Sequence, residues 1–199
     1  MIDIDVRDLP AADRTAVPWK NGGGVTREIL CHPQGADMAD FAWRVSLAEV
    51  AADGPFSAFP GVDRTLTMAD GDGMELTVGG RPVLVDSPYV PRDLPGDVPT
   101  DCRLLGAGNI VNLNVMWRRD ALPAAPSVAV VRGRIELGPG PTLVVALGAE
   151  GAEAAGRVLG RYDAALVTGP APLRATGPTA VITVAAPVPA SEPVSRRSA

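Results

Sequence analysis

The residues best suited to chemistry gather in one short segment, PWKNGGGVTREI at residues 18–29. It holds the only lysine of the chain, Lys20, beside the amide of Asn21 and three consecutive glycines. Glycine loses more conformational freedom on folding than other residues, so such a run suits a sharp turn or a close approach. One interpretation is a loop whose N–H groups, with Lys20 and Asn21, receive a carboxylate. The other, which composition alone favours, is a flexible turn with Trp19 as a core anchor.

Two further polar side chains share one face of an expected strand at residues 41–47. Large apolar residues alternate there with Arg44 and Ser46, and a period of two is typical of a strand. A guanidinium offers a planar set of donors that suits a carboxylate. If this face lines a barrel, Arg44 and Ser46 belong to a binding site; if it faces solvent, they are a polar exterior.

A loop at residues 53–64 places two phenylalanines between Gly-Pro and Pro-Gly turns and ends in Asp63 and Arg64. A structural loop closed by an ion pair is the favoured interpretation, and a contribution of Asp63 and Arg64 to a site is the alternative. Cys31 and His32 are adjacent, but neighbouring strand residues point to opposite faces. The pair therefore does not indicate a nucleophile with its base.

Residue counts exclude several classes of site. The chain has 199 residues, of which 46% are hydrophobic and 21% charged, the profile of a globular protein. With a single histidine, a site of two or three histidine ligands cannot form in one chain, so we expect no metal and no cofactor. A net charge of −5 and the lack of a basic run argue against nucleic acid. The two cysteines lack the CxxC spacing of zinc or redox motifs.

The beginning of the sequence alternates acidic and apolar residues and lacks the basic and apolar regions of a leader. No stretch approaches the roughly 20 apolar residues that a membrane span requires. We therefore expect a cytoplasmic protein that does not bind membranes.

Strand patterns dominate the sequence and predict an all-β fold. Apolar and polar residues alternate near residues 66–78 and again at 111–117, where Asn112, Asn114 and Met116 share one face. After residue 120, short apolar runs are separated by Gly-Pro turns. Short strands at close, regular spacing indicate a β-sandwich or barrel.

Three long motifs, in this order, resemble the HutD/Ves family: PWKNGGGVTREI, then FAWRVSLAEVAADGPFSAFPGVDRTLTMADGDGMELTV, then LPGDVPTDCRLL with VNLNVMWRR. They span roughly residues 7–119. The resemblance implies a bicupin, two jelly-roll β-barrels packed in one compact chain, in agreement with the strand pattern. We expect an N-terminal barrel over residues 1–119, a smaller cupin-like barrel over 120–187 and a flexible tail over 188–199.

The resemblance also implies which residues bind a ligand. Those that match the family motifs are Trp19, Lys20, Asn21, Arg44, Ser46, Asp63, Arg64, Asn112 and Asn114. Lys20 is our first choice among them, because the chain otherwise uses arginine 17 times and its one lysine falls inside the most distinctive motif.

The function expected from the resemblance is binding of a small anionic metabolite without a metal. The family is associated with histidine utilisation, so formiminoglutamate or urocanate is the expected kind of ligand, and the Ves branch carries a stress-induced label. A regulatory or metabolic-control role is favoured over catalysis. A metal-independent isomerase or hydrolase for a small organic acid is the alternative, and a module for protein interaction is the third option. Both a monomer and a homodimer stay open.

Overall fold

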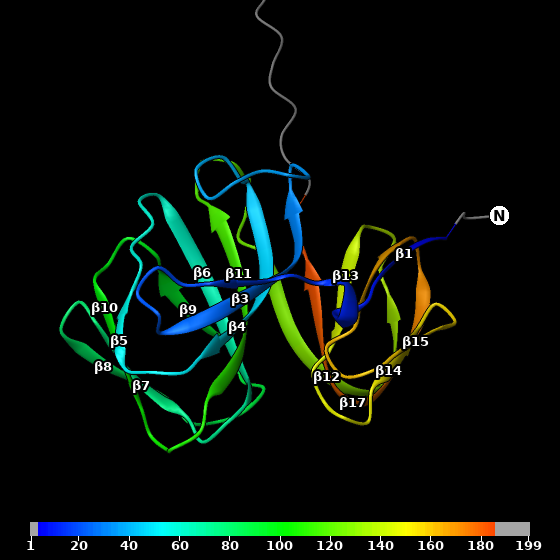
Figure 1. Cartoon of the computed structure of the whole chain (residues 1–199). Coiled ribbons are helices and arrows are strands. Elements are labelled where there is room, and N and C mark those ends of the chain that lie inside the picture. The colour runs from blue at the N-terminus through cyan, green and yellow to red at the C-terminus, as the bar shows by residue number, and fades with distance from the viewer. Residues whose placement is uncertain (1–3, 186–199) are drawn as a thin grey trace, which may run out of the picture.

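The computed structural model describes residues 4–185 and confirms the all-β prediction. These residues form seventeen strands and one short 3-10 helix, η1 (Ala11–Asp13), and they contain no α-helix. No helix in this part of the chain is long and apolar enough to cross a membrane. The tail expected at residues 188–199 lies outside the described residues. The strands form two barrel-like units side by side (Figure 1).

The first barrel is built from two antiparallel sheets. The larger has the order β2-β3-β4-β11-β6-β9, with β2 (Ala16–Pro18), β3 (Gly24–His32), β4 (Trp43–Val50), β11 (Ile110–Arg118), β6 (Val62–Asp70) and β9 (Arg92–Pro95). The smaller has the order β5-β10-β7-β8, with β5 (Gly54–Phe56), β10 (Thr100–Leu104), β7 (Met74–Val78) and β8 (Arg81–Val85).

The second barrel is one curled sheet of seven strands. Its order is β1-β16-β13-β17-β14-β15, with β12 also paired to β17; the strands are β1 (Asp5–Leu9), β16 (Ala164–Thr168), β13 (Thr142–Ala146), β17 (Ala171–Thr183), β14 (Ala152–Ala154), β15 (Arg157–Leu159) and β12 (Ser127–Leu137). The chain passes from one unit to the other between β11 and β12. That both units are complete jelly rolls stays a prediction.

The start of the chain departs from the expected division at residue 119. β1 pairs antiparallel with β16, from Asp5 opposite Thr168 to Leu9 opposite Ala164, so it belongs to the second barrel. Residues 1–119 were expected to form one unit, but their first strand completes the sheet of the other. This pairing joins residues about 160 positions apart, which strand periodicity cannot reveal.

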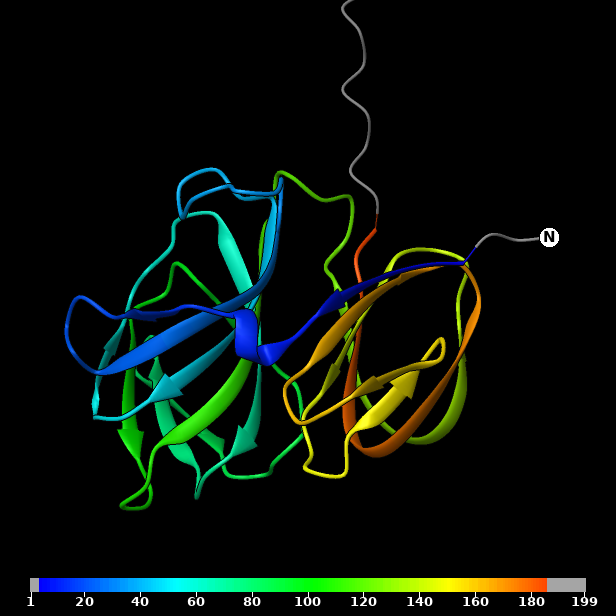
Figure 2. The same cartoon turned by 45° about the vertical axis from the view of Figure 1, so that its right-hand side comes forward.

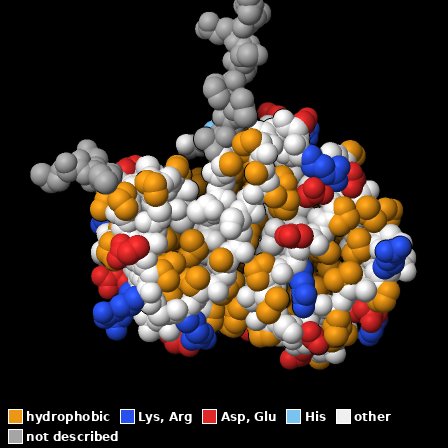
Figure 3. All heavy atoms as spheres, turned by 180° about the vertical axis from the view of Figure 1, so that it is seen from behind, with side chains coloured by type: hydrophobic (Ala, Val, Ile, Leu, Met, Phe, Trp, Pro, Cys, Tyr) orange, Lys and Arg blue, Asp and Glu red, His pale blue; other side chains and the backbone are white. Residues whose placement is uncertain are grey.

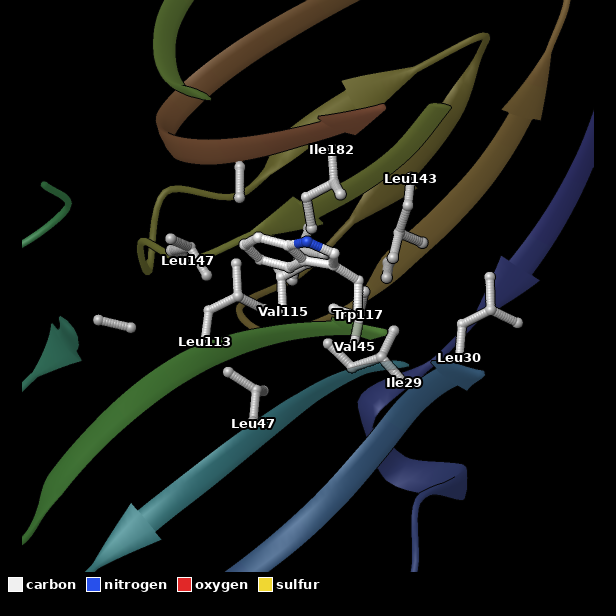
Figure 4. Packing of buried hydrophobic residues seen from close by; sticks show 14 of the residues in the cluster. Ile29, Leu30, Val45, Leu47, Leu113, Val115, Trp117, Leu143, Leu147 and Ile182 are labelled. Atoms are coloured by element: carbon white, nitrogen blue, oxygen red, sulfur yellow. The ribbon is translucent and has the colours of Figure 1, made fainter. Parts of the chain in front are cut away.

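The two barrels share an apolar core, and β4 and β11 supply most of the residues that the first barrel contributes to it. Val45 and Leu47 of β4 and Leu113, Val115 and Trp117 of β11 leave the sheet on one face. They pack against residues of the second barrel that include Leu143, Leu147 and Ile182 (Figure 4). The opposite face of the same two strands therefore looks into the first barrel.

A second apolar cluster fills one end of the first barrel. Leu66 and Met68 of β6 pack there against Met74 and Leu76 of β7 and Cys102 of β10. Seen from behind, acidic and basic side chains of the described residues are interspersed with apolar ones, without a continuous basic surface on that face (Figure 3).

Replacing Trp117 with alanine tests the shared core. Trp117 is only 7% exposed and lies between the barrels, so we expect Trp117→Ala to lower the free energy of unfolding by about 3–5 kcal/mol in urea denaturation. Val158→Ala is the control, because Val158 is 84% exposed and should change it by less than about 0.5 kcal/mol. A loss below about 1 kcal/mol for the tryptophan variant would contradict a shared core.

The thiol of Cys102 provides a test by pH. Burial raises its pKa from 9.0 to about 11, so the folded protein keeps the proton where the unfolded chain loses it. This contribution to stability is fully present below pH 9 and is lost as the pH rises toward 11. We expect the free energy of unfolding to fall over that range, and to fall less steeply in Cys102→Ala. Equal slopes for the two proteins would show that the thiol is not buried in this way.

Candidate functional site

Alternation along three strands directs polar side chains into the first barrel. Val50, Leu66 and Ile110 pack in its interior cluster, so residues of the same parity on β4, β6 and β11 point inward too. These inward positions include five of the residues expected at a site: Arg44, Ser46, Arg64, Asn112 and Asn114. The face that carries Arg44 and Ser46 therefore lines the barrel, and their part in a binding site stays a prediction.

Strand register places these side chains in two neighbouring rows. Ser46 lies opposite Glu28 on one side and Asn114 on the other. In the next row, Met116 lies between Arg44 and Arg64. Strands are spaced about 4.8 Å apart, so the two arginine backbones are separated by about 10 Å, which two long side chains can span. We call Glu28, Arg44, Ser46, Arg64 and Asn114 the polar layer.

Arg44 is held at one side of the polar layer by Glu28. Its Nε donates to Glu28 Oε2 at 2.7 Å, and its side chain is 14% exposed. Its two terminal nitrogens have no hydrogen-bond partner among the described residues. Glu28 was not singled out from the sequence, although it stands in the PWKNGGGVTREI motif on the strand beside Arg44.

Arg64 lies at the other side of the layer and is almost completely buried, with 5% exposed. Its Nη2 donates to the carbonyl oxygen of Ser57 at 3.3 Å, and its guanidinium lies over the rings of Phe56 and Phe59, 5.5 and 5.9 Å from their centroids. Within residues 4–185 no carboxylate pairs with it. Burial lowers the pKa of this guanidinium, because the charged form is deprived of water.

Three polar atoms of the layer are buried without a partner: Ser46 Oγ, Arg64 Nε and Asn114 Oδ1. Buried polar atoms in folded proteins are nearly always hydrogen-bonded. Only six side-chain atoms in the described part of the chain lack a partner in this way, and half of them belong to this one layer. The buried polar atoms without a partner are thus concentrated in this one layer.

Asn112 and Asp63 lie outside the polar layer. Asn112 is buried one row further along, opposite Ala48 and Met68, at the boundary with the apolar cluster. Asp63 points to the other face of β6, where its two oxygens accept from Nε and Nη2 of Arg119 at 2.9 Å each. The ion pair expected at the end of the 53–64 loop therefore forms with Arg119, since Asp63 and Arg64 leave the strand in opposite directions.

Trp19 and Asn21 shape the turn between β2 and β3. Trp19 Nε1 donates to Thr26 Oγ1 at 2.7 Å, and the Trp19 ring meets the Phe56 ring edge to face at 6.0 Å. Asn21 Oδ1 accepts from the Gly23 N–H at 3.0 Å. A side chain on Gly24 would collide with the Glu49 carbonyl oxygen, which explains a glycine there by packing.

Lys20 is exposed at the tip of that turn, and it forms no ion pair with any described residue. The turn adjoins Gly24, which pairs with Val50, whereas Arg44 pairs with Cys31 at the other end of the same two strands. The structure therefore separates Lys20 from the polar layer, and the layer uses arginine as its cation instead.

Cys31 and His32 point to opposite faces, as predicted. Cys31 is buried, and its pKa is raised by burial and then by Glu28, which makes the thiol a poor nucleophile. The exposed His32 ring stacks on Trp43 at 5.9 Å.

An open cavity of about 540 Å³ lies beside the polar layer, and Glu28 and Arg44 are the members of the layer that line it. Residues of the N-terminal segment, among them Arg7, Asp13 and Arg14, line the same cavity.

Comparison with known proteins places the chain in a family. The family model described as HutD matches residues 11–183. The chain belongs to the HutD family. Among curated relatives, an uncharacterized 21.2 kDa protein in the hutC 3' region of Pseudomonas putida is 39% identical over 109 residues, 55% of this chain and 56% of that protein. Protein Ves of Cronobacter sakazakii is 37% identical over 63% of this chain and 65% of its own length. The chain thus spans less than two thirds of these relatives.

Solved structures of similar proteins agree with the HutD assignment. HutD from Pseudomonas fluorescens SBW25 superposes with a TM-score of 0.79 at 30% identity, over 92% of this chain and 98% of that one. A conserved protein of unknown function from Pseudomonas aeruginosa gives 0.78 at 27% identity, over 92% and 100%. A cupin 2 conserved barrel protein from Leptotrichia buccalis, at 0.56 and 16% identity over 84% and 92%, shows that the fold is cupin-like.

The residues of this chain do not fit the metal site that is common in proteins with a cupin-like fold. The inward positions carry two guanidiniums, a hydroxyl, two amides and the Glu28 carboxylate, which is already paired with Arg44, and cations repel a metal ion. The single histidine is exposed on the other face of β3. The described residues contain no group of three or more His, Cys, Asp or Glu side chains that could hold a metal ion.

Proposed function

We propose that the first barrel binds a small carboxylate metabolite at the polar layer, in a regulatory or metabolic-control role. The observation that carries this proposal is Arg64, a buried cation without an anionic partner in the described structure. A buried charge costs several kcal/mol unless it is paired. A ligand carboxylate would provide the missing anion.

The other groups of the layer suit the same ligand. Arg44 has free terminal nitrogens, the Ser46 hydroxyl can donate, and the Asn114 amide can both donate and accept. One carboxylate, Glu28, and two guanidiniums leave a single net positive charge, which matches one negative charge on the ligand. Arg64 and Ser46 are buried, so a hydrogen bond from either of them to a carboxylate is stronger than at a surface.

The relatives favour histidine utilisation as the context. One relative is a protein in the hutC 3' region of Pseudomonas putida. The structure of HutD from Pseudomonas fluorescens is of a formate condition. Formate is the simplest carboxylate, so it is a suitable first probe. Urocanate and formiminoglutamate are larger acids of the expected kind, and each carries a carboxylate for Arg64.

Binding is favoured over catalysis by the state of the titratable groups. Glu28 is engaged with Arg44, and the Cys31 pKa is raised, so neither group is poised as a base or a nucleophile. Lys20, which an enzyme would use in proton transfer, lies away from the layer.

Replacing Arg64 with methionine separates binding from stability. For the native protein we expect formate, urocanate or formiminoglutamate to raise the melting temperature, since ligand at 100 times Kd contributes about 2.7 kcal/mol. Arg64→Met should lose that response. Its own melting temperature should be equal to or above the native value, because the variant no longer buries an unpaired charge. Differential scanning fluorimetry measures both quantities.

Two controls sharpen this experiment. Arg27→Met removes a partly exposed arginine of the same barrel, which pairs with Glu49 outside the polar layer, and should keep the full ligand response. Formamide has the shape of formate without its charge and should give no shift. No response to any carboxylate, or an equal response to formamide, would refute the proposal. Loss of urocanate absorbance over hours would favour the enzyme alternative.

A further inference from the structure

The N-terminal segment crosses from the second barrel to the first, and we call residues 5–14 the strap (Figure 2). Its first half is β1, which is paired along its length with β16. After η1 the chain enters β2, which pairs with β3 of the first barrel. The strap is therefore part of one barrel at its start and joined to the other at its end.

The second barrel also holds the strap at its midpoint. Arg14 Nη1 donates to the Tyr162 carbonyl oxygen and Arg14 Nη2 to the Leu9 carbonyl oxygen, both at 2.7 Å. Asp163 Oδ1 accepts from the Ala11 N–H at 2.7 Å, and its other oxygen accepts from the Gly160 N–H. A single turn of the second barrel, residues 160–163, thus fixes the strap from two directions.

The position of Arg14 is energetically unfavourable in one respect, the burial of its guanidinium. Its guanidinium is partly buried, and its Nε is a buried donor without a partner in the described structure. An unsatisfied buried donor disfavours the arrangement. The two short bonds from its terminal nitrogens offset this: one joins the strap to the second barrel at Tyr162, and the other joins two parts of the strap at Leu9.

The strap lines the same cavity as part of the polar layer. Residues 7–10, 13 and 14 of the strap share the 540 Å³ cavity with Glu28, which is exposed, and Arg44, which is partly buried. Small-molecule sites have volumes of about 300–1,000 Å³, so this cavity has room for a metabolite. Beyond residue 27, no strand of the described residues pairs with β3 on this side, because β2 pairs only with residues 25–27.

We propose that the ligand reaches the polar layer through the cavity beneath the strap, and that the second barrel, by holding the strap at Arg14 and Ala11, controls how fast the ligand leaves. This inference rests on the proposed carboxylate binding. Arg14 is then a positioning residue, and the second barrel contributes to binding without contacting the polar layer.

The test compares ligand dissociation in two variants that loosen the strap from different sides. Arg14→Lys keeps the charge but cannot reach both carbonyl oxygens with a planar pair of donors. Asp163→Asn weakens the bond to the Ala11 N–H. With urocanate as the probe in stopped-flow binding, we expect the dissociation rate to rise about fivefold or more in both, with the association rate equal or higher. Hydrogen exchange should show residues 5–14 losing protection in both.

Arg132→Lys is the matched control, since Arg132 is an exposed arginine of the second barrel that pairs with Glu150, away from the strap. It should bind and release urocanate as the native protein does. A purely structural role of Arg14 and Asp163 would lower the melting temperature without changing the dissociation rate, and that result overturns the inference while binding itself stands. If the native protein binds no carboxylate, the proposed function fails and this inference fails with it.

Discussion

Trp117, Leu113 and Val115 leave β11 toward the second barrel, while Asn112 and Asn114 leave the same strand toward the inside of the first. Because both faces are buried, the register of this strand is strongly specified: a slip of one residue would exchange every side chain between the two faces. The apolar contact between the barrels therefore fixes which residues form the polar layer. The precision of the candidate site depends on packing that lies on the other side of its own sheet.

The strands themselves could be predicted from the sequence, because alternation at β4, β6 and β11 is clear. The sequence does not predict whether the polar face of these strands points into the barrel or toward solvent. In a barrel standing alone, the apolar residues Val45 and Leu47 would point inward, and Arg44 and Ser46 would face solvent. A second barrel covers the apolar face instead, so the polar face becomes the interior. Only the tertiary arrangement shows this, since periodicity identifies faces but not what covers them.

The rarity of lysine in the sequence did not identify a residue of the polar layer. Lys20 is unique in the chain, yet it is exposed in a turn whose shape follows from Trp19 packing and from the space available at Gly24. Arg64 is one of many arginines, and nothing in the sequence marks it as the buried cation. The motif match included Arg44, Ser46, Arg64 and Asn114, which the structure brings together in the polar layer. Its assignment to binding stays a prediction.

The pairing of β1 with β16 gives the chain an interlocked architecture. The first strand, β1, completes the sheet of the second barrel, although the chain forms the whole first barrel, β2–β11, before it reaches β12. The second barrel is not complete without the start of the chain: cutting between β11 and β12 would remove β1 from the edge of its sheet and leave that strand unpaired on the other fragment. Evolution can therefore vary the two barrels in size and surface, but it cannot readily shuffle one of them into a different protein by recombination at the linker.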